Sequence, residues 1–185
     1  LWKDGMEDWR PLGEVPELTE RMFFTTCNRA EVYGVAEGPL LKTVEATTAS
    51  LERYRNLDSS ALAGALYTYT DTEAARHVFR VASSLDSMVI GEPQILGQVK
   101  AAYTAARSQQ ATGIILNNLL EQAFHVAKRV RTETGIAAAA VSISSVAVEL
   151  ARKIFGDLEG RTVLILGGAR WRNWRSATWW TTACA

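Results

Sequence analysis

Hydrophobic residues follow strand-like spacing in two neighbouring segments near the start of the chain. Residues 21–26 (RMFFTT) and 31–36 (EVYGVA) are rich in aromatic and β-branched residues. The four residues between them predict a short connection, either a hairpin or a strand corner. Much later, residues 162–166 (TVLIL) form a continuous apolar run, which is typical of a buried parallel strand.

Helical spacing of the apolar residues begins after residue 70. Thr70 and Glu73 have the spacing of a capping box and predict the start of a helix that runs to about Ser83. Pro93 suits the first turn of a second helix. Its predicted inward stripe consists of Ile95, Leu96, Val99, Ala102, Tyr103 and Ala106.

Two more helices are expected in the second half of the chain. The third ends at Gly135, which is predicted to be a left-handed terminator, and the fourth runs from a cap at Ser142 through Phe155. The predicted inward stripe of the third helix consists of Ile115, Leu116, Leu119, Leu120, Ala123, Phe124, Ala127 and Val130.

The composition describes a globular chain without a dominant charge. Of the 185 residues, 48% are hydrophobic and 22% are charged, which excludes a disordered tail or a fibrous repeat. Lysine plus arginine equals aspartate plus glutamate at 20 each, so the basic excess typical of DNA-binding proteins is absent. No apolar run approaches the roughly 18 residues of a membrane span, and no signal peptide is visible. We expect a protein that binds neither membrane nor DNA.

Cysteine and histidine are scarce. The two cysteines, Cys27 and Cys184, are too few for a disulfide framework. With only His77 and His125 beside them, no zinc-ligand spacing occurs, so no metal site is expected. These features predict a reducing, cytoplasmic environment.

The two ends of the chain differ from its middle. The chain starts at Leu1 rather than methionine, and residues 170–185 hold four of the six tryptophans and three arginines but no acidic residue. This abrupt change in composition matches no helical or strand period. It suggests a frameshifted or misjoined reading frame after Ala169.

Cys27 and His77 are the first candidates for chemistry. Cys27 lies at the expected end of a strand, two residues before Arg29, whose guanidinium would favour a thiolate nucleophile. The alternative is an inert buried cysteine, because free cysteine is among the most buried residue types. His77 is either a functional imidazole or an ordinary helix histidine with satisfied hydrogen bonds.

A polar loop and a basic cluster are the other candidates. Residues 85–98 (LDSMVIGEPQILGQ) place two acids, a hydroxyl and two amides around glycines, an arrangement suited to binding a polar substrate. The alternative is a plain connection between helices, in which Asp86 and Ser87 act as caps. Lys128, Arg129 and Arg131 form either a solvated helix face or a phosphate contact.

Several of these segments together resemble one enzyme family. Thr26-Cys27-Asn28-Arg29 with Glu31-Val32-Tyr33, then 77–82 (HVFRVA), 85–98 and 141–147 (VSISSVA), resemble glutamyl-tRNA reductase in order and spacing. The resemblance covers roughly residues 20–169. It implies NADPH-dependent reduction of glutamyl-tRNA to glutamate 1-semialdehyde, the first step of tetrapyrrole (porphyrin and haem) biosynthesis.

The resemblance also implies a role for each matching residue. Cys27 would attack the aminoacyl ester to form a thioester, Arg29 would bind the glutamate α-carboxylate, and His77 would orient the substrate or assist proton transfer. Glu92 is a candidate partner for the substrate ammonium. The implied substrate pocket consists of Thr26, Asn28, Arg29, Ser87, Glu92, Pro93, Gln94 and Gln98.

The chain departs from the family pattern at several places. Ser84 stands where the family commonly has glycine. Gly167, Gly168 and Ala169 occupy the start of the expected dinucleotide-binding loop, but Ala169 and Arg172 replace two of its glycines. The family is usually a homodimer, and its helical dimerisation region is absent. We therefore expect an incomplete chain in which NADPH binding is doubtful.

These observations lead to a fold class and a domain division. We expect an α/β protein, with a ferredoxin-like α+β catalytic domain in residues 1–135. Residues 136–185 would hold the first helix and strand of an incomplete Rossmann domain, with an aberrant tail from about residue 170. Two alternatives stay open: a catalytically inactive remnant that acts only as a packing or association module, and a different dehydrogenase built around residues 162–169.

Overall fold

The computed structural model describes residues 10–26, 28–58, 62, 64–87, 89–136 and 143–162. The elements with described bounds are a 3-10 helix, two strands and five α-helices. Their bounds are η1 (Arg10–Glu14), β1 (Leu18–Thr25), β2 (Ala30–Ala36), α1 (Leu40–Arg55), α3 (Asp71–Ala82), α4 (Pro93–Ser108), α5 (Ile114–Glu133) and α6 (Ile143–Phe155).

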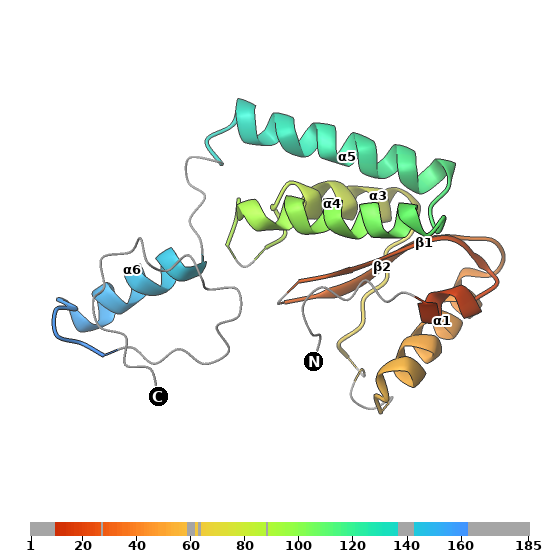
Figure 1. Ribbon diagram of the computed structural model, residues 1–185, viewed down its shortest axis with the longest axis horizontal. Helices are drawn as coiled ribbons and strands as arrows, with labels where there is room; N and C mark the ends of the chain where they lie inside the picture. Colours follow the sequence, from red (N-terminus) through yellow and green to blue (C-terminus); the bar gives the residue numbers. More distant parts are fainter. Residues whose placement is uncertain are drawn as a thin grey trace.

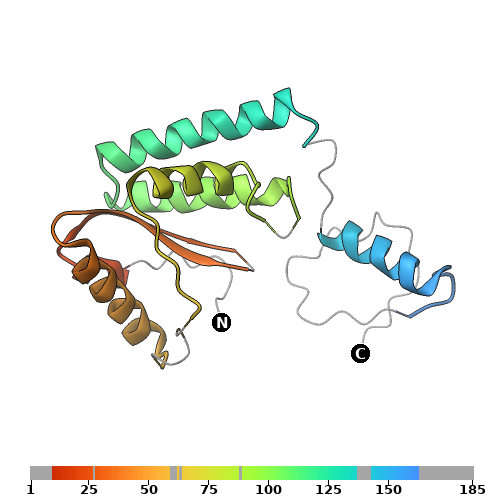
Figure 2. The ribbon, with the colours of Figure 1, turned by 180° about the vertical axis from the view of Figure 1, so that it is seen from behind.

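The two strands form an antiparallel hairpin, which confirms the first of the two predicted arrangements. In its register Phe24 pairs with Glu31 and Met22 pairs with Tyr33. Helices α3, α4 and α5 lie on one side of this hairpin and α1 lies on the other, whereas α6 stands apart (Figures 1 and 2). The described part is thus a mixed α/β structure with a small two-stranded sheet.

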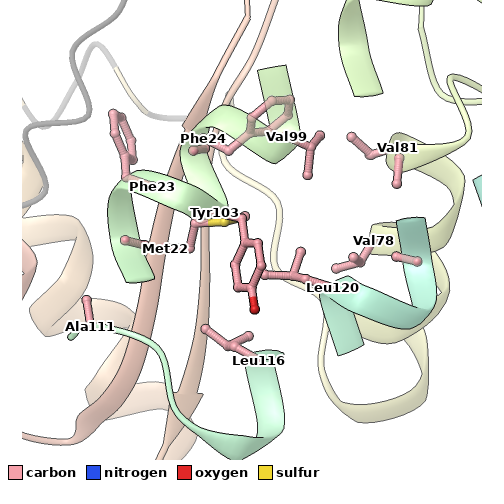
Figure 3. Close-up of a cluster of buried hydrophobic side chains, with 14 of the residues drawn as sticks. Met22, Phe23, Phe24, Val78, Val81, Val99, Tyr103, Ala111, Leu116 and Leu120 are labelled. Carbon is pink, nitrogen blue, oxygen red and sulfur yellow. The ribbon is translucent and has the colours of Figure 1, made fainter. Parts of the chain in front are cut away.

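The hydrophobic core lies between β1 and the three helices that cover it. Met22, Phe23 and Phe24 are consecutive and all buried, so both faces of this strand are covered. Figure 3 shows the resulting cluster, in which side chains of β1 lie near those of α3, α4 and α5. Its labelled members are Met22, Phe23, Phe24, Val78, Val81, Val99, Tyr103, Ala111, Leu116 and Leu120.

Helix α5 is attached to the hairpin by a carboxylate from β1. Glu20 accepts the backbone N–H groups of Ile115 at 3.1 Å and Leu116 at 2.7 Å, and so satisfies two donors at the helix start. Gly113 makes this approach possible, because a Cβ there would lie 2.6 Å from a Glu20 carboxylate oxygen. A contact across more than ninety residues therefore fixes the start of α5.

The helix predictions hold for position and for most of the buried residues. All six predicted stripe residues of α4 are buried or partly buried, and Pro93 is at its start. In α5 the predicted stripe is buried or partly buried except for Ile115 in the first turn, which is 57% exposed.

Helix α3 starts after Thr70 and ends before Ser83 as predicted, but two predicted details of helix ends are wrong. The Thr70 side chain makes no capping hydrogen bond to α3, whose first residue, Asp71, has a φ of 47° rather than a helical value. Gly135 is not left-handed, because Thr134 ends α5 in an extended conformation and its hydroxyl donates to the Val130 carbonyl. The predicted cap Ser142 and residues 163–166 of the predicted parallel strand lie outside the described residues.

None of the described helices has both the length and the apolar character needed to cross a lipid bilayer. The ferredoxin-like topology and the Rossmann start stay predictions.

Candidate active site

The connection between β1 and β2 is a tight turn organised by Thr26. Its hydroxyl accepts the backbone N–H groups of Asn28 and Arg29, each at 3.2 Å, and its own N–H donates to the Arg29 carbonyl at 2.9 Å. Thr26, Asn28 and Arg29 are three of the predicted substrate residues. Cys27, the predicted nucleophile between them, lies outside the described residues.

Arg29 extends from this turn to two carboxylates. Its Nη1 donates to Asp86 Oδ2 at 2.8 Å and to Glu31 Oε1 at 3.2 Å, and its Nη2 donates to the Asp86 carbonyl oxygen. Burial lowers the pKa of Arg29, but the hydrogen bond to Asp86 and the two carboxylate charges outweigh burial, so the net shift is upward. The guanidinium is a permanently charged, oriented set of donors.

Glu31 is a buried carboxylate at the centre of the site. Besides the contact with Arg29, it accepts hydrogen bonds from the hydroxyls of Tyr33 and Tyr67 and lies 3.0 Å from His77 Nε2. Burial raises the pKa of Glu31, but hydrogen bonds from His77, Tyr33 and Tyr67 and the charge of His77 outweigh that effect and lower it to about 2. Glu31 is therefore ionised at neutral pH.

His77 projects from α3 into this cluster. Its side chain is 11% exposed, and its Nδ1 lies 4.0 Å from Asp86 Oδ2, which is too long for a hydrogen bond. The rings of Tyr69 and Tyr67 pack against it at centroid distances of 4.8 Å and 5.7 Å. The orientation of the predicted catalytic histidine is thus fixed by the contact of Nε2 with Glu31 and by packing against two tyrosine rings.

Asp86 belongs to a loop that folds back on itself. Ser84 closes the loop, because its carbonyl accepts the Gly91 N–H at 2.9 Å and its hydroxyl donates to the Glu92 carbonyl at 2.8 Å. Ser84 has a φ of 58°, a conformation that favours glycine. The glycine that the family resemblance leads one to expect at this position would suit this conformation. Asp86 also accepts from Arg80 at 3.0 Å, so it serves as an arginine partner rather than as a helix cap.

The other predicted substrate residues lie in this loop and at the start of α4. Ser87 is partly buried, Glu92 is 9% exposed, and Pro93 and Gln94 are exposed. Burial raises the pKa of Glu92. Within the described residues, the amide oxygen of Gln98 is buried and accepts no hydrogen bond. In the part of the chain that the structure describes, none of these residues hydrogen-bonds to Arg29 or His77, so the hydrogen-bonded cluster holds only part of the predicted set.

The remaining predicted features contribute no further chemistry to the site. Gly167, Gly168 and Ala169, the predicted cofactor residues, lie outside the described residues. Arg129 binds Glu133 one turn away on an exposed helix face, which favours the solvated-face reading of the basic cluster. Among the residues that the structure describes, no group of three or more histidine, cysteine or acidic side chains is arranged to hold a metal ion.

A family comparison agrees with the motifs that surround this site. The family described as "Glutamyl-tRNAGlu reductase, N-terminal domain" matches residues 3–134. The chain belongs to the glutamyl-tRNA reductase family. The match includes the turn at Thr26, the α3 histidine and the loop before α4.

Individual members of the family are similar over most of this chain. The glutamyl-tRNA reductase of Geotalea uraniireducens is 51% identical over 160 residues, which are 84% of this chain and 36% of that protein. The enzyme of Syntrophotalea carbinolica is 50% identical over 165 residues, 87% of this chain and 36% of that protein. The solved glutamyl-tRNA reductase from Methanopyrus kandleri has a TM-score of 0.58 and 34% identity, and the match covers 82% of this chain and 35% of that one. The chain thus spans about a third of the length of these relatives.

Some residues of the cluster were not among the predicted site residues. The sequence indicates Glu31 and Tyr33 only as parts of a motif and Asp86 only as an acid in a polar loop, and it indicates no role for Tyr67 or Tyr69. One signal was available for Glu31, because a single acid between apolar residues of a strand is unusual. For Tyr67 and Tyr69, which lie outside any helix or strand, no periodicity pointed to a role.

Proposed function

We propose that this chain carries the substrate-binding and acylation part of glutamyl-tRNA reduction, in which glutamyl-tRNA becomes glutamate 1-semialdehyde through a thioester on Cys27. The observation that supports it most is the meeting of Arg29 and His77, from separate elements, around Glu31 and Asp86 beside the turn that contains Cys27. Family membership adds the chemistry of the substrate.

The charges of the site suit the amino-acid end of this substrate. Arg29 presents donors of the kind that bind a carboxylate. In this structure these donors bind a side-chain oxygen and the backbone oxygen of Asp86. Glu92 and the buried Gln98 oxygen are acceptors of the kind that an ammonium group needs. A substrate α-carboxylate would replace Asp86 on Arg29 or share the guanidinium with it.

In the acylation step the Cys27 sulfur bonds to the ester carbonyl carbon as the carbon–oxygen bond to the tRNA ribose breaks. The thiol proton ends on the ribose oxygen that leaves. His77 is the side chain in the cluster that can accept this proton on a ring nitrogen and pass it on.

NADPH, when bound, supplies the hydride that turns the thioester into an aldehyde and a free thiol. The residues predicted to hold it lie outside the described residues. The division at residue 135 into a catalytic domain and the start of a nucleotide-binding domain is part of the same proposal. So is a cytoplasmic location, since charged tRNA is made inside the cell.

The test is covalent labelling. The chain is incubated with glutamyl-tRNA, and the adduct is located by mass spectrometry of the intact protein and its peptides. We expect a glutamyl thioester on Cys27, lost in Cys27→Ser and retained in the matched control Cys184→Ser. An adduct that persists in Cys27→Ser contradicts the proposal, and a wild-type chain that forms no adduct supports an inactive association module instead.

A further inference from the structure

The His77 imidazole has two nitrogens in unequal surroundings. Nε2 lies 3.0 Å from Glu31 Oε1, a hydrogen-bond distance, whereas Nδ1 lies 4.0 Å from the nearest Asp86 oxygen. A neutral imidazole carries one proton, on one nitrogen or the other. The partner of Nε2 therefore decides which nitrogen stays free to accept a proton.

Glu31 can act only as an acceptor toward His77. Its side chain is 4% exposed, and it already receives hydrogen bonds from Arg29 and from the hydroxyls of Tyr33 and Tyr67. With these donors its carboxylate is ionised at neutral pH, and an ionised carboxylate has no proton to give. The proton of the neutral imidazole must then reside on Nε2.

We propose that Glu31 is a positioning residue that holds His77 as its Nε2–H tautomer, so that Nδ1 is the nitrogen that takes a proton during acylation. This inference rests on the proposed function. Two aromatic rings support it, because Tyr67 and Tyr69 lie against the imidazole and oppose rotation of the ring away from Glu31.

The charges around the imidazole are matched to this role. Glu31 and Asp86 are negative, Arg29 and Arg80 are positive, and the four form one connected set of ion pairs. A proton on Nδ1 makes His77 a cation between two carboxylates, which stabilise it. The proton passes from the Cys27 thiol to Nδ1 and from there to the leaving ribose oxygen, so the imidazole ends neutral.

A simpler role for Glu31 is to neutralise the charge of Arg29. Nitrogen NMR of the histidines distinguishes this role from the positioning of His77. The chain has only two histidines, and exposed His125 is an internal control. In ¹⁵N-histidine-labelled wild-type protein above the titration of histidine, we expect His77 as a single Nε2–H tautomer and His125 as a solvent-averaged mixture. A His77 that is averaged like His125, or that carries its proton on Nδ1, overturns the inference. No substrate is needed, so the result is independent of whether the proposed function is correct.

The variant Glu31→Gln keeps the shape of the side chain but removes its charge. We expect His77 to lose its single tautomer and the acylation rate constant at saturating glutamyl-tRNA to fall roughly 10-fold to 100-fold, the range for one hydrogen bond to a charged group. The half-saturating concentration should change less, since Arg29 keeps its bond to Asp86. Glu133→Gln, which removes an exposed carboxylate paired with Arg129, is the matched control and should behave as wild type.

Tyr67→Phe gives a second, milder change at a half-exposed position. It removes one donor from Glu31 and leaves the His77 contact in place, so we expect the single tautomer to persist and the rate to fall less than tenfold. An acylation rate unchanged in folded Glu31→Gln contradicts the positioning role. If Glu31→Gln does not fold, the spectra of the wild type and of Tyr67→Phe test the inference instead. The absence of a single Nε2–H tautomer of His77 in either protein contradicts the positioning role of Glu31.

Discussion

The buried carboxylate of Glu31 makes the stability of the protein depend on pH in a direction that follows from its surroundings. Its folded-state pKa is lowered from 4.5 to about 2, so the folded protein holds the proton less tightly than the unfolded chain does. This stabilisation is complete above about pH 5 and is lost as the pH falls through the folded-state pKa. The lowered pKa therefore predicts weakening in acid rather than in base.

The size of the effect follows from the shift. At about 1.4 kcal/mol per pKa unit, lowering the pKa from 4.5 to about 2 contributes about 3 kcal/mol at neutral pH. At pH 3 the unfolded carboxyl is mostly protonated and the folded one is still mostly ionised, so about 2 kcal/mol of this is already lost. Because the side chain is only 4% exposed, solvent screening reduces the value little.

Urea unfolding of wild type and Glu31→Gln at pH 7 and pH 3 measures this contribution. Glutamine does not titrate, so the variant keeps only the pH dependence of the other groups, including Asp86, whose pKa is also lowered, chiefly by its hydrogen bond with Arg29. We expect wild type to lose about 2 kcal/mol more than the variant between the two pH values. Equal losses in the two proteins would refute the assignment of Glu31 as the buried, hydrogen-bonded carboxylate of the site.

Three further predictions concern single positions. Arg29→Lys keeps the charge but loses the oriented donors, so acylation should fall roughly 30-fold to 150-fold in a single-turnover thioester assay; an unchanged rate would remove Arg29 from the site. Gly113→Ala pushes a methyl group against the Glu20 carboxylate and should lower the free energy of unfolding by about 2 kcal/mol. The control Gly97→Ala has open space around the new Cβ and should raise the free energy of unfolding by up to about 1 kcal/mol. Equal effects of the two substitutions in urea unfolding would contradict the role of Glu20 at the start of α5. Ser84→Gly should be more stable than Ser84→Ala in thermal unfolding, because both lose the hydroxyl but only glycine relieves the left-handed backbone, and the reverse order would argue against that conformation.

Periodicity predicted the two strands and helices α3, α4, α5 and α6, and it predicted the buried faces of α4 and α5, but it did not predict helix α1 (Leu40–Arg55). The hairpin and the stripe of α4 follow from local apolar spacing, since a strand or a helix buries residues at a fixed interval. The motifs at residues 26–33, 77–82, 85–98 and 141–147, taken together, predicted the family, which the comparison over residues 3–134 confirms. The interactions at individual helix ends were less predictable, because Thr70 has the extended backbone of a cap residue but its side chain makes no capping hydrogen bond, and Gly135 is not left-handed.

Only the tertiary structure decided which polar atoms meet. Glu31 joins Tyr67, which is 36 residues away, and His77, which is 46 residues away, while Arg29 finds Asp86 across 57 residues. Spacing along one element states which face is buried but not which side chain of another element will face it. That pairing depends on how the hairpin, α3 and the loop before α4 pack together. The packing turns a strand acid, a helix histidine and a loop acid into one charged cluster.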